Sequence, residues 1–146
     1  MSEQKVGVEE ALKKPLPTPD GDSQPMWDGF KEGKLLLQHC GDCGHVQYYQ
    51  QGICRNCQSP NLQHQKASGR GVIHSYSVVH RAPGPAFRDD VPYAVLLVEL
   101  EEGPRMISRL VGQDFDSLDF DLPVRLETIK VSDELFLPYF ALNECN

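Results

Sequence analysis

The second half of the chain alternates short apolar runs with turns, and this pattern predicts strands rather than helices. The runs are rich in β-branched and aromatic residues. The run at 92–100 is almost continuously apolar, as expected of a strand buried on both faces. The predicted strands are 71–80, 92–100, 104–111, 124–131 and 135–142. Five strands with no long helix between them indicate a small Greek-key barrel.

Residues 26–66 follow a different pattern, in which one short helix precedes three short strands. Met26, Trp27 and Phe30 fall on one face at helical spacing, and Gly33 is well placed to end the helix. The predicted strands of this part are 35–39, 45–49 and 62–66. The first two form a hairpin, and its tip carries the first of two cysteine pairs.

The chain therefore divides into a flexible tail or linker at 1–25, a helix with a cysteine-bearing ribbon at 26–65, and a barrel at 66–146. The segment 6–14 could form a helical turn or two, whereas 15–25 contains four of the eleven prolines and is expected to be extended. We expect a mobile tail, because termini are usually loose unless tied down. An arm that docks on a partner is the alternative.

Charge and composition narrow the classes of partner. The net charge is −7, and residues 66–146 hold more acidic than basic side chains, so no basic excess favours nucleic acid. No apolar run reaches the roughly 20 residues that span a bilayer, and the N-terminus lacks the apolar core of a signal peptide. We therefore expect a cytoplasmic protein without a membrane partner. In that compartment, clustered cysteines indicate metal or redox chemistry rather than disulfides.

The cysteines carry the strongest chemical signal, in the pattern C-x2-C-x10-C-x2-C at Cys40, Cys43, Cys54 and Cys57. Two residues between cysteines let a tight turn aim both sulfurs at one point, and two such turns supply a tetrahedron of thiolates. Zinc favours this arrangement, with Zn–S distances of about 2.3 Å. Four cysteines leave no open coordination position, so the predicted zinc is structural rather than catalytic.

Alternatives to a zinc site remain. The two pairs could be buried or redox-active thiols, and iron fits the same tetrahedron. Gly44 follows the first pair and suits a positive φ, but Gln58 stands at the equivalent position of the second pair. The second turn must therefore accept strain or fold differently. Cys145 is expected to be a free thiol without function.

The string WDGFKEGKLLLQHCGDCGHVQYY, the CRNC pair and SGRGVIHSYSVVHRAPGPAFRDDVPYAVLLVELEEG resemble the family first catalogued as domain of unknown function thirty-five. The resemblance runs from about residue 26 to 140. It implies a rubredoxin-like zinc ribbon joined to a C-terminal five-stranded OB-fold. It also implies a non-catalytic, acyl-CoA-binding or scaffold subunit that partners a thiolase-fold enzyme in lipid, polyketide, isoprenoid or steroid metabolism.

Two other functions are kept as alternatives. Zinc ribbons and OB barrels both commonly bind DNA or RNA, so a nucleic-acid-binding module is the first. A small enzyme that uses His74 or His80 is the second, because a spacing of six places both on one face of a strand. No nucleophile or carboxylate stands at motif spacing from either histidine, which argues against this enzyme.

The loop at 80–87 is the candidate ligand site. Prolines stiffen it, and Arg81, Phe87 and Arg88 could take the phosphates and adenine face of CoA. The structural alternative is a proline-stiffened loop with surface arginines. Large aromatics are candidates for a partner interface; they are Trp27, Phe30, Phe87, Phe136 and Tyr139, of which some must pack in the core. The aspartates of 112–123 do not match a calcium loop and are expected to be solvated.

Overall fold

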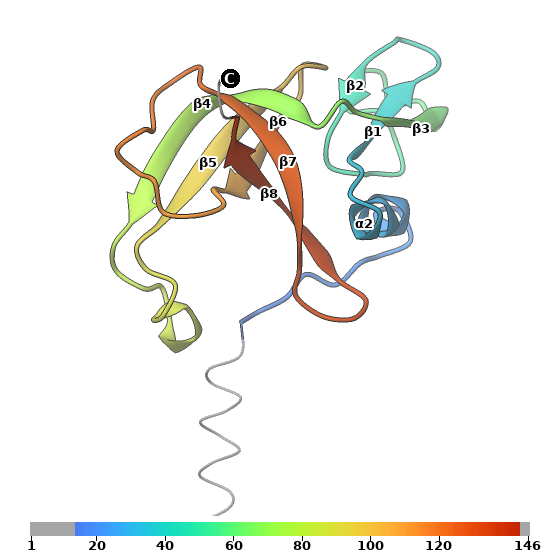
Figure 1. Ribbon diagram of the computed structural model, residues 1–146. Helices are drawn as coiled ribbons and strands as arrows, with labels where there is room; N and C mark the ends of the chain where they lie inside the picture. The colour runs from blue at the N-terminus through green and yellow to red at the C-terminus, as the bar shows by residue number, and fades with distance from the viewer. Residues whose placement is uncertain (1–13, 144–146) are drawn as a thin grey trace, which may run out of the picture.

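A computed structural model describes residues 14–143 as a small three-stranded ribbon beside a five-stranded barrel (Figure 1). The elements are α2 (Gln24–Lys31), β1 (Leu36–Cys40), β2 (Val46–Gln47), β3 (Leu62–Lys66), β4 (Arg70–Val79), the 3-10 turn η1 (Pro85–Phe87), β5 (Tyr93–Leu100), β6 (Arg105–Arg109), β7 (Pro123–Lys130) and β8 (Phe136–Leu142). The helical turn expected at 6–14 lies, except for Lys14, outside the described residues, and so does Cys145.

The ribbon is an antiparallel sheet in the order β2-β1-β3. Its central strand pairs Gln38 with Gln47 on one side and with His64 on the other. The strand expected at 45–49 is only two residues long, because the following residues leave the sheet to carry the second cysteine pair. The helix begins two residues earlier than expected, with Pro25 in its first turn, where a missing N–H costs nothing.

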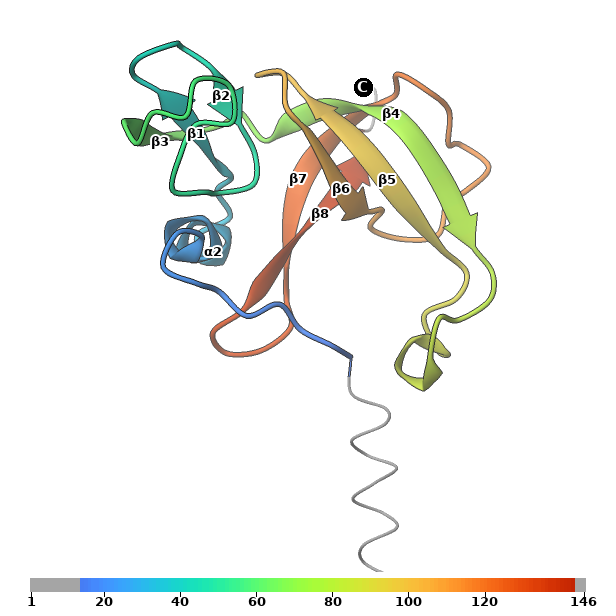
Figure 2. The ribbon, with the colours of Figure 1, turned by 180° about the vertical axis from the view of Figure 1, so that it is seen from behind.

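The barrel contains all five predicted strands, in the order β6-β5-β4-β7-β8. A parallel bridge between Leu110 and Phe140 brings the two ends of this sheet together and nearly closes it. Figure 2 shows β4, β5 and β6 as one wall, with β7 and β8 crossing behind them. The mainly β fold, with a ribbon before an OB-type barrel, is therefore confirmed.

Two expectations for individual strands are wrong. Alternate residues of β5 are buried and half-buried, so only one of its faces is fully covered. In β4, the pairing shifts between Ile73 and Ser75, which makes His74 the extra residue of a bulge. The bulge breaks the alternation of the strand, and His80 lies beyond its end. The spacing of six therefore does not place His74 and His80 on one face.

The helix α2 joins the two parts through a single continuous core. It contacts β1 of the ribbon and β7 and β8 of the barrel. Met26, Trp27 and Phe30 are buried in the same cluster as Ile73 and Phe140 of the barrel. Trp27 and Phe30 therefore cannot serve as interface residues, and that expectation is wrong for both. Their edge-to-face packing, with ring centroids 5.5 Å apart, lies inside the protein.

The SGRG motif positions the first barrel strand. A side chain at Gly71 would lie 2.5 Å from the Glu99 carbonyl oxygen of β5, so only glycine allows this close pairing. The motif thus sets the approach of β4 to β5 directly after the ribbon ends. Within residues 14–143, no helix has the length and hydrophobicity that a membrane crossing requires.

Candidate functional site

The four cysteines lie on two turns of the ribbon that have matching backbone hydrogen bonds. In each turn, the backbone N–H of the first cysteine (position i) donates to the carbonyl of residue i+5. The carbonyl of the same cysteine accepts a hydrogen bond from the backbone N–H of residue i+4. The bonds are Cys40 to His45 at 2.9 Å, Gly44 to Cys40 at 3.0 Å, Cys54 to Ser59 at 2.8 Å and Gln58 to Cys54 at 2.9 Å. The two turns therefore present their sulfurs in the same way.

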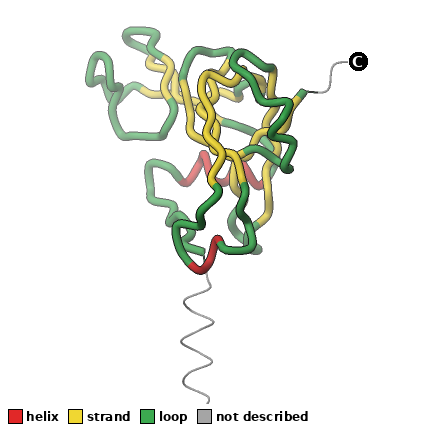
Figure 3. Tube along the Cα trace, turned by 90° about the vertical axis from the view of Figure 1, so that its left-hand side faces the viewer, coloured by secondary structure: helices red, strands yellow, loops and turns green. Residues whose placement is uncertain are grey.

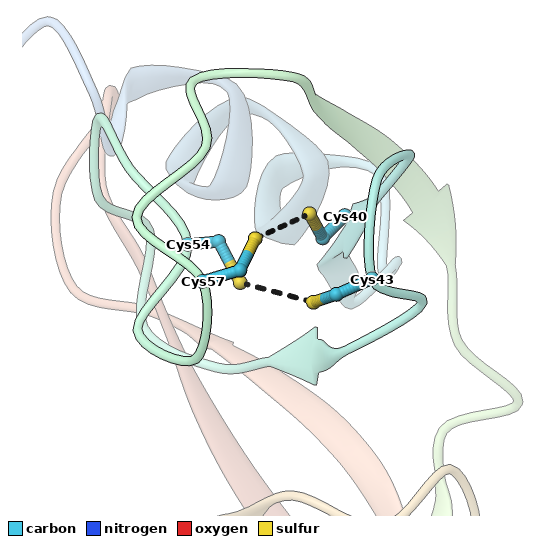
Figure 4. A group of neighbouring side chains, drawn as sticks. All are labelled: Cys40, Cys43, Cys54 and Cys57. Carbon is cyan, nitrogen blue, oxygen red and sulfur yellow. Dashed lines mark hydrogen bonds between the residues drawn. The ribbon is translucent and has the colours of Figure 1, made fainter.

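Figure 4 shows the four thiols converging on one point. Their sulfurs all lie within 4.8 Å of one another, with Cys40 3.5 Å from Cys57 and Cys43 3.6 Å from Cys54. A tetrahedron with Zn–S distances of about 2.3 Å has S–S edges of about 3.8 Å. The thiols therefore fit a tetrahedral ion with little movement. In residues 14–143, they are the only group of three or more metal-binding side chains close enough to share an ion.

Asn56, between the second pair of cysteines, stabilises negative charge at this centre. Its side-chain amide donates to the Cys43 sulfur at 3.5 Å and lowers the pKa of Cys43 to about 6. A backbone hydrogen bond from Ser59 favours the Cys57 thiolate, but desolvation and the three neighbouring thiols outweigh it and raise the pKa of Cys57 to about 12. Because the pKa of Cys57 is raised, a bound cation must displace the proton of that thiol.

The second turn accepts strain rather than folding differently. Gln58 has φ 65°, close to the 77° of Gly44 at the equivalent position of the first turn. For a residue with a Cβ, this left-handed conformation is unfavourable by roughly 1 kcal/mol, whereas glycine adopts it without this cost. The sequence had left both outcomes open.

We expect Gln58→Gly to stabilise the zinc-loaded protein by about 1 kcal/mol, because it relieves this strain. Gly44→Ala is the matched control and should destabilise by a similar amount, since it introduces the same strain into the first turn. Urea denaturation of the three zinc-loaded proteins measures both changes. A Gln58→Gly protein no more stable than the parent would contradict the assigned strain.

Three buried glutamines, which the sequence analysis did not single out, hold the loop that carries the second turn. Gln47 donates to the Gln38 side chain at 2.8 Å and accepts from the Arg55 backbone N–H at 3.0 Å. Gln38 in turn donates to the Gln51 carbonyl, and Gln50 donates to the Leu36 carbonyl. The three glutamines within residues 47–51, of which Gln47 and Gln50 are buried, were a visible signal, but the partner of each glutamine depends on tertiary structure.

The predicted ligand loop projects from the end of the barrel away from the ribbon, as Figures 1 and 3 show. Phe87 is half-buried, packs on Tyr93 at 6.4 Å between ring centroids and lines a hollow of about 580 Å³. Arg81 and Arg88 are exposed and do not line this hollow. Of the three predicted ligand residues, only Phe87 therefore borders the hollow.

An ion network anchors the base of this loop, and sequence spacing gave no sign of it. Asp90 accepts from Lys14 at 2.7 Å and from Arg109 at 2.9 Å. These two cations lower the pKa of Asp90, with the Lys14 hydrogen bond as the largest cause. The Arg109 guanidinium also lies 4.4 Å from the Tyr93 ring centroid. The loop is thus held by groups distant in sequence.

The other candidate groups do not assemble into a site. In the described residues, no histidine side chain makes a hydrogen bond or an ion pair. In the acidic segment, Leu118 is buried and Phe115 packs on the core, which anchors the segment to the barrel. Phe120 is 60% exposed.

Two family profiles match consecutive parts of the chain. The profile described as "ChsH2, rubredoxin-like zinc ribbon domain" matches residues 27–63. The profile described as "ChsH2, C-terminal OB-fold domain" matches residues 64–128. Four cysteines grouped closely in a ribbon of this type are consistent with a structural zinc ion.

Two kinds of curated relative are similar to this chain. A "DUF35 domain-containing scaffold protein" of Methanothermobacter thermautotrophicus is 42% identical over 68% of this chain and 75% of its own length. A "probable enoyl-CoA hydratase alpha subunit" of Thermomonospora curvata is 35% identical over 87% of this chain. The chain spans only 39% of that relative.

A solved structure shows the same arrangement of both parts. The chain from "Ltp2-ChsH2(DUF35) aldolase" is 34% identical, with a TM-score of 0.77 over 87% of this chain and 98% of that chain. A DUF35 protein of Sulfolobus solfataricus is 12% identical with a TM-score of 0.60, a likeness of fold alone.

Proposed function

The chain belongs to the DUF35 family of zinc-ribbon and OB-fold proteins, and from this we propose that it is a non-catalytic subunit that partners a thiolase-fold enzyme and binds its acyl-CoA. In this proposal, Cys40, Cys43, Cys54 and Cys57 hold one structural zinc. Four thiolates fill the tetrahedron and leave no position for a substrate. The metal therefore holds the ribbon together, and the barrel provides the binding surface.

Names of relatives support a partner role. Two are called alpha subunits and others scaffold proteins, and one structure names an aldolase with two components. The second alpha subunit, "3-oxo-4,17-pregnadiene-20-carboxyl-CoA hydratase alpha subunit" of Mycobacterium tuberculosis, has a CoA thioester in its name, and this chain spans 37% of it. We therefore carry over the subunit role and the class of substrate, but no hydratase activity.

The observation that carries the ligand part of the proposal is the hollow beside η1. Phe87, Leu137 and Tyr139 give it an apolar lining, which suits an acyl chain. Arg81 and Arg88 belong to the same loop and are exposed, so their guanidiniums are free to pair with phosphates. Asp89, Asp90 and Lys14 also line the hollow, and Asp90 is paired with Lys14 and Arg109, so the hollow itself offers no unpaired cation for a phosphate.

We expect Phe87→Ala to weaken binding of octanoyl-CoA by roughly 30-fold, corresponding to about 2 kcal/mol for an aromatic anchor. Phe120→Ala is the matched control, because it removes an exposed phenyl ring from another part of the barrel. Calorimetric titration of the zinc-loaded proteins measures both affinities. Equal affinities of the parent protein and both variants for octanoyl-CoA would show that the ligand does not bind at this loop.

A nucleic-acid-binding module is the competing function. Binding to a phosphate backbone requires an excess of basic side chains, and this requirement distinguishes it from the acyl-CoA-binding subunit. We expect no appreciable binding of single-stranded DNA or RNA at physiological salt, because the chain has a net charge of −7. Fluorescence anisotropy with labelled oligonucleotides tests this. Micromolar affinity that falls steeply with salt would reverse the ranking of the two functions.

A further inference from the structure

A second hollow, of about 360 Å³, lies where the ribbon meets the barrel. The turn after α2, the linker between β3 and β4 and the strand β7 all contribute to it, and Figure 1 shows the linker crossing between the two parts. Its charged lining residues are all cations, in a chain whose net charge is −7; they are Lys34, Lys66, Arg70 and Arg125. We propose that this junction hollow binds a small ligand through a phosphate or diphosphate group, independently of the function proposed above.

The register of the sheet brings two of these cations together. Arg70 of β4 and Arg125 of β7 are direct partners across the antiparallel pair. Like charges directly opposite each other destabilise a sheet unless something neutralises them. Glu101 already pairs with Arg70, so Arg125 is the member of this pair whose charge a bound dianion would neutralise, and arginine forks suit phosphate oxygens.

Carboxylates neutralise only part of the cluster. Glu101 accepts from Arg70 at 2.9 and 3.2 Å, which fixes the orientation of that guanidinium, and Glu32 lies 3.0 Å from Lys34. Lys66 forms no ion pair within residues 14–143, and Arg125 donates only to the Leu142 carbonyl at 3.2 Å there. These two side chains keep uncompensated charge for a ligand.

The shape of the hollow favours a small molecule over an acidic peptide. The four cations come from three segments of the chain that border one hollow. Leu35 and Ala67 are buried beneath it, and an apolar floor strengthens the attraction between an anion and its rim. The volume lies at the lower end of the range for small-ligand sites, so a diphosphate group fits without a long extension.

The test is calorimetric titration of the zinc-loaded full chain with inorganic pyrophosphate. We expect binding that weakens with salt, and a loss of about tenfold or more in Lys66→Ala/Arg125→Ala, since a charge-assisted hydrogen bond contributes at least that much. Lys31→Ala/Lys130→Ala removes two exposed cations elsewhere and should leave the affinity within twofold. Equal losses in both double variants, or no binding by the parent chain, would overturn the proposal.

Amide chemical shifts locate the bound anion without any substitution. Pyrophosphate should move the signals of Gly33 and Gly69, which line the hollow, and leave unchanged that of Gly52, in the ribbon loop before the second cysteine pair. Movement at Gly52 without movement at Gly33 and Gly69 would contradict the site. Titration with adenosine diphosphate tests whether the natural ligand is a nucleotide or free diphosphate. If adenosine diphosphate binds more tightly than pyrophosphate and moves the same glycine signals, the ligand is a nucleotide. Binding of an acidic peptide in place of either phosphate compound would refute the ligand class.

Discussion

Replacing Cys54 by Ser is expected to abolish stoichiometric zinc binding and to unfold the ribbon. The parent protein should contain about one zinc per chain, and structural zinc in small domains contributes roughly 10–16 kcal/mol. Cys54 is fully buried, so a serine hydroxyl there leaves both a weak ligand and a buried polar group. Metal analysis of the purified proteins gives the zinc content. It also tells zinc from iron, which the thiol geometry does not.

Trp27 reports the structural consequence of this change. It is the single tryptophan of the chain and is buried in α2 beside the ribbon, so its emission should shift to longer wavelength when the ribbon unfolds. Because the core is continuous through α2, removing zinc with a chelator should also lower the melting temperature of the barrel. The barrel itself can remain folded at room temperature after the zinc is removed. Cys145→Ser is the control and should retain full zinc. A zinc-free Cys54→Ser protein as stable as the parent would refute a structural metal.

Replacing Phe30 by Ala is expected to destabilise the whole protein by about 3–5 kcal/mol, a large share of the stability of a domain this size. Phe30 is fully buried and packs on Trp27, in the cluster that joins the ribbon to the barrel. Its loss should therefore lower the stability of both parts together. The measurement is urea denaturation of the zinc-loaded protein, followed by tryptophan emission and far-ultraviolet circular dichroism.

Phe120→Ala removes a phenyl ring that is 60% exposed and packs on Tyr76 with ring centroids 5.5 Å apart, so it should cost at most about 1.5 kcal/mol, well below the loss at Phe30. Two separate unfolding transitions in Phe30→Ala, with the barrel transition unchanged, would show that α2 does not couple the parts. A single transition at lower urea is the expected result.

Local pattern was sufficient to predict the strands and the metal centre. Each barrel strand carries its own apolar run, and each cysteine pair closes its own turn, so both are encoded within a few residues. The errors have non-local causes. The alternation of β4 fails at a bulge whose position depends on pairing with β5. The helix aromatics, chosen as interface candidates, are buried because barrel strands cover them.

The predicted ligand loop shows the same limit. Proline content predicted its stiffness, and the structure places Phe87 against a hollow. The contacts of Asp90 with Lys14 and Arg109 join residues far apart in the chain, and no motif marks them. The junction hollow is likewise assembled from distant segments. In the sequence, its cations look like ordinary surface residues. Only the register of β4 and β7 shows that two of them lie opposite each other.

The most direct test of the accessory-subunit proposal is co-expression with a thiolase-fold protein from the same genome. Gel filtration of the mixture, with activity assays of each chain alone and of both together, gives the answer. The proposal predicts that the two proteins elute as one complex, that this chain alone has no turnover, and that the mixture is more active than the thiolase-fold protein alone. Separate elution, with full activity in the thiolase-fold protein by itself, would contradict it.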